Sequence, residues 1–438
     1  MNQSLSSTSQ PFNAPEPRGA HHTTLPAEIW ANIFGHLSSL PGQSLAPLAA
    51  VCRGWQREIE PLTFSDIVVR PTDNDIAMLR RVLGDSCRSS ILSKITFFGP
   101  SEDETLQQID ESGNQTSTSM KICHFFTCLG STAREHSYPP LTLTFAGWDD
   151  PRAPVNTLQD SDLVAQSLGA HHPSQCRVKH IVLALERRLW SSTMFADMVR
   201  YCSPELKKID LGLFAEDSDE AEYNTCFMRA LQRSLRNTNL EEINALYPSS
   251  VLDQESHSFS YRWMVASFVH ISRNLRVFRV QDLAADMFYD LARRVEWPNL
   301  HTLEIHSSTL GGTATTFFQD DYLENAVTLV TTVSKAVHRM KNLKRLVLRQ
   351  RLWLYYDDIW DLECWAWLDM DFKVNVPQRR TEATTATLSI RGVEPKDEAI
   401  EAWNTAVSKE RGIPLNGQVG WNAHQKNPRV RRIMNGGW

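Results

Sequence analysis

One cluster of cysteine and histidine residues is the first candidate for chemistry, because both side chains bind metal ions. Cys123, His124 and Cys128 lie close together in the phrase KICHFFTC. Structural zinc sites need ligands paired at a spacing of two to four residues, with a second pair downstream. No C-x-x-C occurs in the chain, and Phe125 and Leu129 place apolar side chains in the same stretch. The phrase therefore predicts an amphipathic helix rather than a metal site.

Paired histidines and paired acids are the next candidates, and they fall in segments that we expect to be loops. The histidine pairs are His21-His22 and His171-His172, the second of them near Cys176, and acidic pairs occur at Asp149-Asp150 and Asp357-Asp358. Such pairs on loops are usually just hydrated. The chain lacks the G-x-G-x-x-G, G-x-x-x-x-G-K-[ST], G-x-S-x-G and H-E-x-x-H motifs. We therefore predict a protein that is not an enzyme and that holds no metal or cofactor.

Composition narrows the classes of partner. The chain has 438 residues, 42% of them hydrophobic and 22% charged, and a net charge of -6. Nucleic acids and anionic lipids require a basic surface, which this balance does not favour. No stretch approaches the roughly 18 uninterrupted apolar residues of a membrane span. The eight cysteines are scattered, and several lie in apolar stretches, as expected for reduced thiols of a cytoplasmic or nuclear protein.

The N-terminal segment LPAEIWANIFGHL (25–37) has the pattern of an amphipathic helix. Pro26 suits the first helical position, where its missing N–H costs nothing. Ile29, Ile33 and Leu37 follow at a spacing of four, which places them on one face. We expect this face to pack against the helices that follow or against a partner.

Two further short helices are predicted after a break at SSLPGQ. Ser44 can cap the helix SLAPLAAVC, and Trp55 and Ile59 share a face of a third helix that we expect Pro61 to end. Three short helices in about 40 residues are too few to enclose so many large apolar side chains. The surplus of apolar faces predicts a protein partner.

These residues, in the pattern LPAEIW..IF..L, L..L..VCR.WQ and IEP.TF, resemble the F-box of filamentous-fungal F-box proteins. The resemblance implies a three-helix unit that binds the Skp adaptor and, through it, a cullin–RING ubiquitin ligase. Transferred position by position, the residues implied in adaptor binding are Leu25, Pro26, Ile29, Ile33, Leu37, Leu48, Val51, Cys52 and Trp55. The alternative is a helical hairpin that packs on the rest of the chain, with some of these residues in its core.

A short phrase recurs through the middle of the chain, in which a leucine-like residue and two polar residues precede alternating apolar residues. The instances are 178–185, 206–213, 240–246, 275–280, 300–305 and 343–348, with degenerate forms at 91–98 and 141–145. Alternation of this kind predicts a strand with one face buried. Helical periodicity lies between the phrases, at 223–235, 262–271, 285–295 and 322–340.

Strands and helices that alternate at intervals of 25 to 43 residues predict an α/β solenoid with parallel strands. The phrases resemble the irregular leucine-rich repeats that follow F-boxes. We therefore predict a tail without fixed structure at 1–22, the F-box at 23–66, the solenoid at 67–350 with loops near 101–119 and 149–176, a C-terminal cap or extension at 351–410, and a Gly-rich tail at 411–438.

The segment 351–372 is unusually rich in aromatic and acidic residues. One interpretation is a cap over the last apolar layer of the solenoid, and the other is a surface that captures a basic segment of a target. For the second, the candidate residues are Trp353, Tyr355, Tyr356 and Trp360. A strand at 387–391 and a helix at 396–409 are predicted after it.

The predicted function is that of a substrate-recognition adaptor of a Skp–cullin–F-box ubiquitin ligase. The F-box would bind the Skp adaptor, and the solenoid would bind a protein target whose identity the sequence does not disclose. The alternative is a protein-interaction scaffold that uses an F-box-like module outside a ligase. Neither hypothesis requires nucleic acid, a membrane or a cofactor.

Overall fold

The computed structural model divides the chain into two compact units, Met1–Phe64 and Ser65–Trp438, which we describe separately. The residues that the structure describes are 26–38, 45–70, 72–98, 118–146, 176–183, 199, 202, 205–212, 231–233, 235, 239–246, 259–281, 285–313, 319–356, 359–377, 383–391 and 397–419. The predicted tail at 1–22 and most of the two predicted loops lie outside them.

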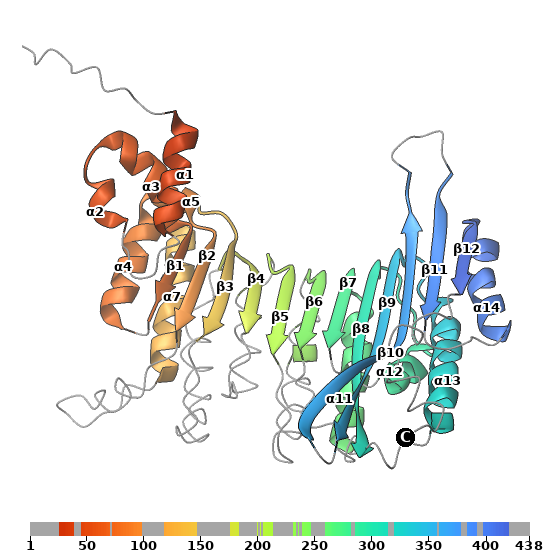
Figure 1. Cartoon of the computed structure of the whole chain (residues 1–438). Coiled ribbons are helices and arrows are strands. Elements are labelled where there is room, and N and C mark those ends of the chain that lie inside the picture. Colours follow the sequence, from red (N-terminus) through yellow and green to blue (C-terminus); the bar gives the residue numbers. More distant parts are fainter. Residues whose placement is uncertain are drawn as a thin grey trace, which may run out of the picture. The chain divides into compact units, whose positions relative to one another are not determined.

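The first unit consists of the helices α1 (Ala27–Ser38), α2 (Ala46–Ala49) and α3 (Arg53–Phe64). Pro26 immediately precedes α1, and its carbonyl accepts hydrogen bonds from the N–H groups of Ile29 and Trp30. The second helix is shorter than predicted, because Ala50 and Val51 form a turn; Ser44 lies outside the described residues. Figure 1 shows α1 and α3 with the short α2.

The prediction that Pro61 ends the third helix is wrong, because α3 continues to Phe64. Proline lacks the N–H that would bond to the carbonyl four residues earlier, so the helix loses one hydrogen bond at this position. In the last turn, Thr63 Oγ1 donates a separate hydrogen bond to the Ile59 carbonyl at 3.1 Å. A proline so close to a helix end is therefore tolerated.

The second unit contains a sheet of twelve strands, each hydrogen-bonded to its neighbours in the chain (Figure 1). The strands are β1 (Asp66–Val69), β2 (Lys94–Phe98), β3 (Leu141–Ala146), β4 (Val178–Leu183), β5 (Lys208–Gly212), β6 (Glu242–Leu246), β7 (Val277–Gln281), β8 (Thr302–Thr313), β9 (Arg345–Tyr356), β10 (Ile359–Asn375), β11 (Thr385–Arg391) and β12 (Leu415–Val419). Pairing is parallel from β1 to β9 and between β11 and β12, and β10 is antiparallel to both of its neighbours.

Apolar residues run across the sheet in register. One row of directly paired residues joins β1 to β11, and no member is more than 7% exposed: Ile67, Ile95, Leu143, Ile181, Ile209, Ile243, Phe278, Leu303, Leu346, Phe372 and Leu388. A second buried row, from Val69 to Ile390, lies two residues further along each strand except the antiparallel β10, where it lies two residues earlier, at Met370. Because side chains alternate between faces, both rows belong to the same face of the sheet.

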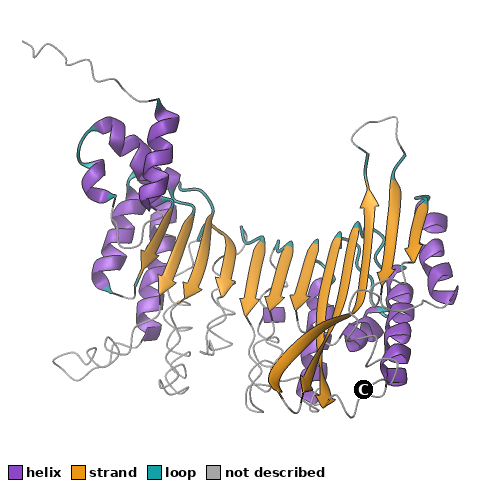
Figure 2. Ribbon diagram, in the orientation of Figure 1, coloured by secondary structure: helices purple, strands orange, loops and turns teal. Residues whose placement is uncertain are grey.

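Helices cover this apolar face. Besides α4 (Asp73–Gly84) and α5 (Ser86–Ile91), the described helices are α7 (Thr118–Glu135), α11 (Phe259–Ser272), α12 (Ala285–Ala292), α13 (Gln319–Val337) and α14 (Asp397–Asn404), the last continued by the π-helix η4 (Thr405–Lys409). Aromatic contacts join helices to strands: Phe125 of α7 lies 4.6 Å from Phe97, and Trp403 of α14 lies 4.8 Å from Phe372, between ring centroids. Figure 2 shows helices and strands in contrasting colours.

All six recurring phrases form strands, β4 to β9, and the two degenerate phrases form β2 and β3. Helices are found at the predicted positions in α11, α12 and α13, whereas most of 223–235 lies outside the described residues. The predicted strand and helix after 387 correspond to β11 and α14 with η4. The strand β10 was not predicted, and residues 415–419, which form β12, were predicted to belong to the Gly-rich tail.

No helix within the described ranges combines the length and the apolar character that crossing a bilayer requires.

Candidate partner-binding surfaces

Three aromatic rings form the centre of the helical unit. Phe34 of α1 is 1% exposed, and its ring centroid lies 5.5 Å from those of Trp30 and Trp55. Trp30 and Trp55 are 5.0 Å apart and tilted, so they hold α1 against α3. Leu45 and Ile59 are buried in the same cluster. The unit therefore has its own small core, built from all three helical segments.

Large apolar side chains remain exposed around this core. Ile29 and Ile33 of α1 are 43% and 37% exposed, Val51 is 62% exposed, and Leu62 of α3 is 40% exposed. Burial of one such side chain is worth about 1.5–3 kcal/mol when it is complete. Four of them on so small a unit provide an apolar surface that a partner can cover.

The structure separates the nine residues implied in adaptor binding into two groups. Pro26, Ile29, Ile33, Val51 and Cys52 are exposed. A second group is half-buried and packs on the aromatic core: Leu37, Leu48 and Trp55. Leu25 lies outside the described residues. The core residues position the surface, and the exposed residues form it.

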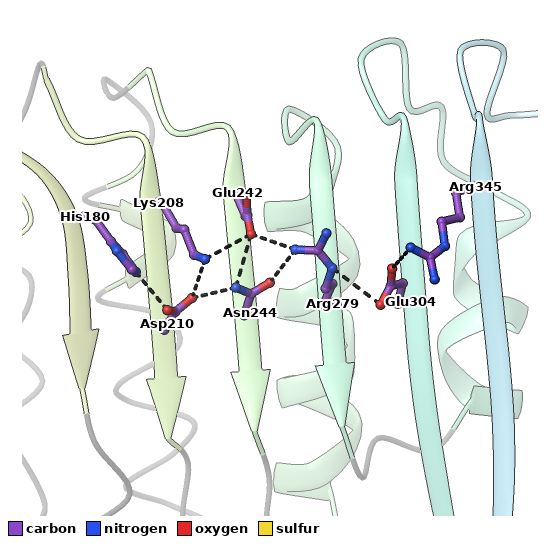
Figure 3. Close-up of polar contacts among 8 residues, drawn as sticks. All are labelled: His180, Lys208, Asp210, Glu242, Asn244, Arg279, Glu304 and Arg345. Atoms are coloured by element: carbon purple, nitrogen blue, oxygen red, sulfur yellow. Dashed lines mark hydrogen bonds and ion pairs between the residues drawn. The ribbon is translucent and has the colours of Figure 1, made fainter. Parts of the chain in front are cut away.

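On the sheet, a row of charged and amide side chains crosses six strands on the face opposite the buried rows (Figure 3). We call this row the polar ladder, and its members are His180, Lys208, Asp210, Glu242, Asn244, Arg279, Glu304 and Arg345. It joins β4 to β9. The strand alternation that buries the apolar residues on one face places these side chains on the other.

One half of the ladder centres on Asp210 of β5. Its carboxylate contacts His180 Nε2 at 2.8 Å and accepts a hydrogen bond of 2.6 Å from Asn244 Nδ2. Lys208 Nζ lies between two acids, 3.6 Å from Asp210 Oδ1 and 3.3 Å from Glu242 Oε1. These contacts link three neighbouring strands through their side chains.

The other half of the ladder centres on Arg279 of β7. Its Nη1 donates to Glu242 Oε1 at 2.7 Å and to Asn244 Oδ1 at 3.2 Å, and its Nε lies 3.4 Å from Glu304. Glu304 also pairs with Arg345 Nη1 at 3.3 Å. Alternation of sign along the row therefore gives each of these charges an opposite neighbour on an adjacent strand.

The ladder changes the pKa of Asp210. Partial burial of this carboxyl favours its neutral form, but the hydrogen bonds from His180 and Asn244, together with the charges of His180 and Lys208, outweigh burial and lower its pKa. The ionised carboxylate is thus the form that the folded protein stabilises.

Asp210→Asn is expected to lower stability by about 1–2 kcal/mol at pH 7, because it removes a charged hydrogen-bond acceptor. A lowered folded-state pKa means that the contribution is complete above the unfolded value of about 3.9 and is lost as the pH falls through the folded value. The difference between wild type and variant should therefore shrink below about pH 4. Urea unfolding at pH 7 and at pH 3 measures it.

Asp371→Asn is the matched control for this prediction, because Asp371 is an exposed acid of β10 outside the ladder. Its substitution should leave stability nearly unchanged at both pH values. Equal effects of the two substitutions would contradict the role given to the ladder.

A hollow of about 460 Å³ opens beside the ladder on the same unit. Asp210, Asn244 and Arg279 line it together with Gln281 and His306. The lining offers carboxylate and amide acceptors beside guanidinium and amide donors.

The sequence reading did not identify the ladder, although its signal is present in the recurring phrases. The polar residues that alternate with the apolar ones, such as Lys208 and Asp210 or Glu242 and Asn244, come from adjacent strands in register. Only the pairing shows that opposite charges meet.

The other candidates from the sequence lie partly outside the described residues. Trp353, Tyr355 and Tyr356 belong to β9 and Trp360 to β10, but their side chains lie outside the described part of the structure. In α7, Cys128 is buried, whereas His124, one turn earlier, is exposed, and the side chain of Cys123 lies outside the described part of the structure. Among the described residues, no group of three or more His, Cys, Asp and Glu could hold a metal ion.

Comparison with known families finds one match. Residues 22–64 match the model described as F-box-like, a segment that includes α1, α2 and α3. F-box domains are modules for protein–protein interaction rather than enzymes. No curated protein matches the chain.

Proposed function

We propose that the chain is a substrate-recognition adaptor of a Skp–cullin–F-box ubiquitin ligase, in which the helical unit binds the Skp adaptor and the sheet unit binds a protein target. The observation that carries this proposal is the exposed apolar surface of Ile29, Ile33 and Val51, on a segment that matches the F-box-like family. Exposed apolar residues on a separately packed helical unit favour a docking module.

Within this surface we assign direct contact to the exposed residues Pro26, Ile29, Ile33, Val51 and Cys52, and we include Leu25. The half-buried residues Leu37, Leu48 and Trp55 act mainly by packing on the core that holds this surface.

For the sheet unit we propose an irregular, leucine-rich-like solenoid whose polar face holds the target. The succession of parallel strands in chain order and the single apolar face with its helices support this assignment. The function is then geometric, because holding a target near the ubiquitin-charged enzyme raises the local concentration of its lysines. The chemistry belongs to other subunits.

The proposed compartment is the cytoplasm or the nucleus, and the proposed origin is fungal. Cys128, Cys176 and Cys202 are buried free thiols, and burial raises the pKa of all three, of Cys176 to about 12. Buried thiols that stay protonated are unreactive, as expected for a protein of a reducing compartment.

Recovery of the Skp adaptor with the tagged full-length chain tests this proposal. The double variant Ile29→Ala/Ile33→Ala should recover at least about tenfold less adaptor than wild type, because it removes two apolar contacts worth about 1.5–3 kcal/mol each when buried. Met78→Ala is the matched control, since Met78 is 41% exposed on α4 of the other unit. Equal recovery with wild type and the double variant would refute the assignment.

Thiol labelling gives a second readout that requires no substitution. Cys52 and Cys87 are both exposed, and the Cys52 Sγ accepts a hydrogen bond from the Trp55 N–H at the start of α3. Adaptor binding should protect Cys52 from labelling and leave Cys87 reactive. If Cys52 stays as reactive in the complex as in the free chain, it does not belong to the interface.

The second candidate function is a protein-interaction scaffold that binds the adaptor outside a ligase. This function is supported by the extent of the F-box-like match, which ends at residue 64 and does not include the sheet unit. The same recovery experiment separates the two functions, because a ligase subunit brings both adaptor and cullin, whereas a scaffold brings adaptor alone.

A further inference from the structure

A hollow with a basic lining lies in the sheet unit, where the chain leaves α12, α13 and η4. Its volume is about 1070 Å³. We call it the basic hollow, and its cationic side chains are Arg293, Arg294, Lys335, Arg339, Lys341 and Arg411. His338 lies among them. Three separate helical elements thus bring their cations to one concave place.

The acids around the basic hollow do not balance these cations. Glu296 and Glu410 line it, and Asp290 and Glu398 pair with Arg293 at 2.6 Å and with Lys335 at 3.3 Å. Six cationic side chains against these four acids leave a surplus of two positive charges. The whole chain carries -6, so this surplus opposes the general charge of the protein.

Helix ends explain part of this charge. Cations are favourable at helix C termini because of the partial negative charge there. Arg411 has this role, since its Nη1 donates to the Leu343 carbonyl at 2.7 Å and its Nη2 donates to the Met340 carbonyl, just after α13. Its guanidinium is committed to the fold and is a poor candidate for a ligand contact.

Two cationic side chains of the basic hollow make no ion pair with a described residue. In the described part of the chain, no acid lies within ion-pair distance of the side chains of Arg294 and Lys341, and both are exposed. The neighbouring pair of Arg339 with Glu296, at 3.3 Å, is exposed by 50% and 64%. Exposed pairs of this kind are worth only about 0–1 kcal/mol, so Arg339 can change partner at little cost.

We propose that the basic hollow binds a phosphoryl group through Arg294 and Lys341, with Arg339 as a third contact. A phosphoryl monoester carries about -1.5 to -2 charges at pH 7, which matches the surplus of two positive charges. Guanidinium groups bind its oxygens in a bidentate manner, and lysine adds a point charge. The group can belong to a phosphorylated segment of a protein or to a small oligophosphate, since both present the same chemistry.

Calorimetric titration of the full-length chain tests the site with two probes. One is tripolyphosphate, and the other is a synthetic peptide with a single phosphoserine, measured beside the same peptide without phosphate. We expect the chain to bind at least one phosphorylated probe, and Arg294→Ala/Lys341→Ala to bind it at least about tenfold more weakly, because charge-assisted hydrogen bonds are lost.

The control is Lys373→Ala/Arg391→Ala, which removes two exposed cations of β10 and β11 outside the basic hollow. It should bind both probes as wild type does. Equal weakening by the two double variants would overturn the site, because attraction would then follow total charge alone. The site is also refuted if neither phosphorylated probe binds at millimolar concentration, or if the peptide binds equally well without its phosphate.

The two probes distinguish the sources of the phosphoryl group. Tighter binding of the phosphopeptide indicates a site for a modified protein, whereas tighter binding of tripolyphosphate indicates a small ligand. The site is separate from the proposed adaptor surface, so Arg294→Ala/Lys341→Ala should recover the Skp adaptor like wild type. Failure of one proposal therefore leaves the other testable.

Discussion

Replacement of Trp297 with alanine is expected to lower the free energy of unfolding of the sheet unit by about 3–5 kcal/mol, the usual range for removal of a buried aromatic side chain. Trp297 is fully buried, and its ring stacks on Phe288 of α12 with centroids 6.4 Å apart. Its Nε1 donates to Ser272 Oγ, at the end of α11, at 2.9 Å. Its backbone N–H donates to the Arg339 carbonyl after α13. The side chain thus joins α11 and α12, which follow two different strands, and the backbone N–H adds a contact after α13 that the alanine variant keeps.

Urea unfolding followed by circular dichroism measures this effect, with two control variants. Trp297→Phe keeps much of the apolar volume but loses the second ring of the indole and its N–H, so we expect an intermediate loss. Trp263→Ala removes a tryptophan of α11 that is 39% exposed, and it should cost much less. A Trp297→Ala variant as stable as Trp263→Ala would contradict the role of Trp297 as the link between the helices.

Phe34→Ala is expected to unfold the helical unit within an otherwise folded chain. Phe34 is 1% exposed and touches both tryptophan rings of the small core. Its loss costs about 3–5 kcal/mol, which is comparable to the entire stability of a unit of this size. Hydrogen exchange of α1 and α3 should become fast, and recovery of the Skp adaptor should fall with it.

Ile33→Ala separates core packing from partner contact, because Ile33 directly precedes the buried Phe34 in α1 but is 37% exposed. This variant should keep slow exchange in α1 and α3 while it weakens adaptor binding. Slow exchange in Phe34→Ala would show that the aromatic cluster does not hold the unit together.

The strands of the sheet were predictable because each phrase carries a complete local signal. In LKKIDLGL, Ile209 and Leu211 alternate with Lys208 and Asp210, and the structure buries the first pair and leaves the second half-exposed. The helix at α12 was predictable for the same reason, since its apolar spacing already defines one face. Local periodicity decides both cases.

The other features depend on contacts between residues that are far apart in the sequence, which no local pattern contains. β10 was not predicted because it pairs with β9 as an antiparallel hairpin and lacks the recurring phrase. Its buried residues Leu368, Met370 and Phe372 follow a stretch in which apolar and polar residues do not alternate regularly. The polar ladder depends on the register of six strands. Of the residues proposed to bind the adaptor, spacing alone could not separate Ile33, which is exposed, from Trp55, which packs on Phe34.

The order of strands in the sheet has a consequence for how this protein can change in length. Each strand pairs only with the strands that precede and follow it in the chain, from β1 to β12. Insertion of one more strand with its helix would separate a single pair of neighbours and leave every other pairing intact. The sheet would grow by about 4.8 Å, one strand spacing, and the row of charges would gain one step. Selection can therefore adjust the reach of the polar face by duplication of a segment, without redesign of the core.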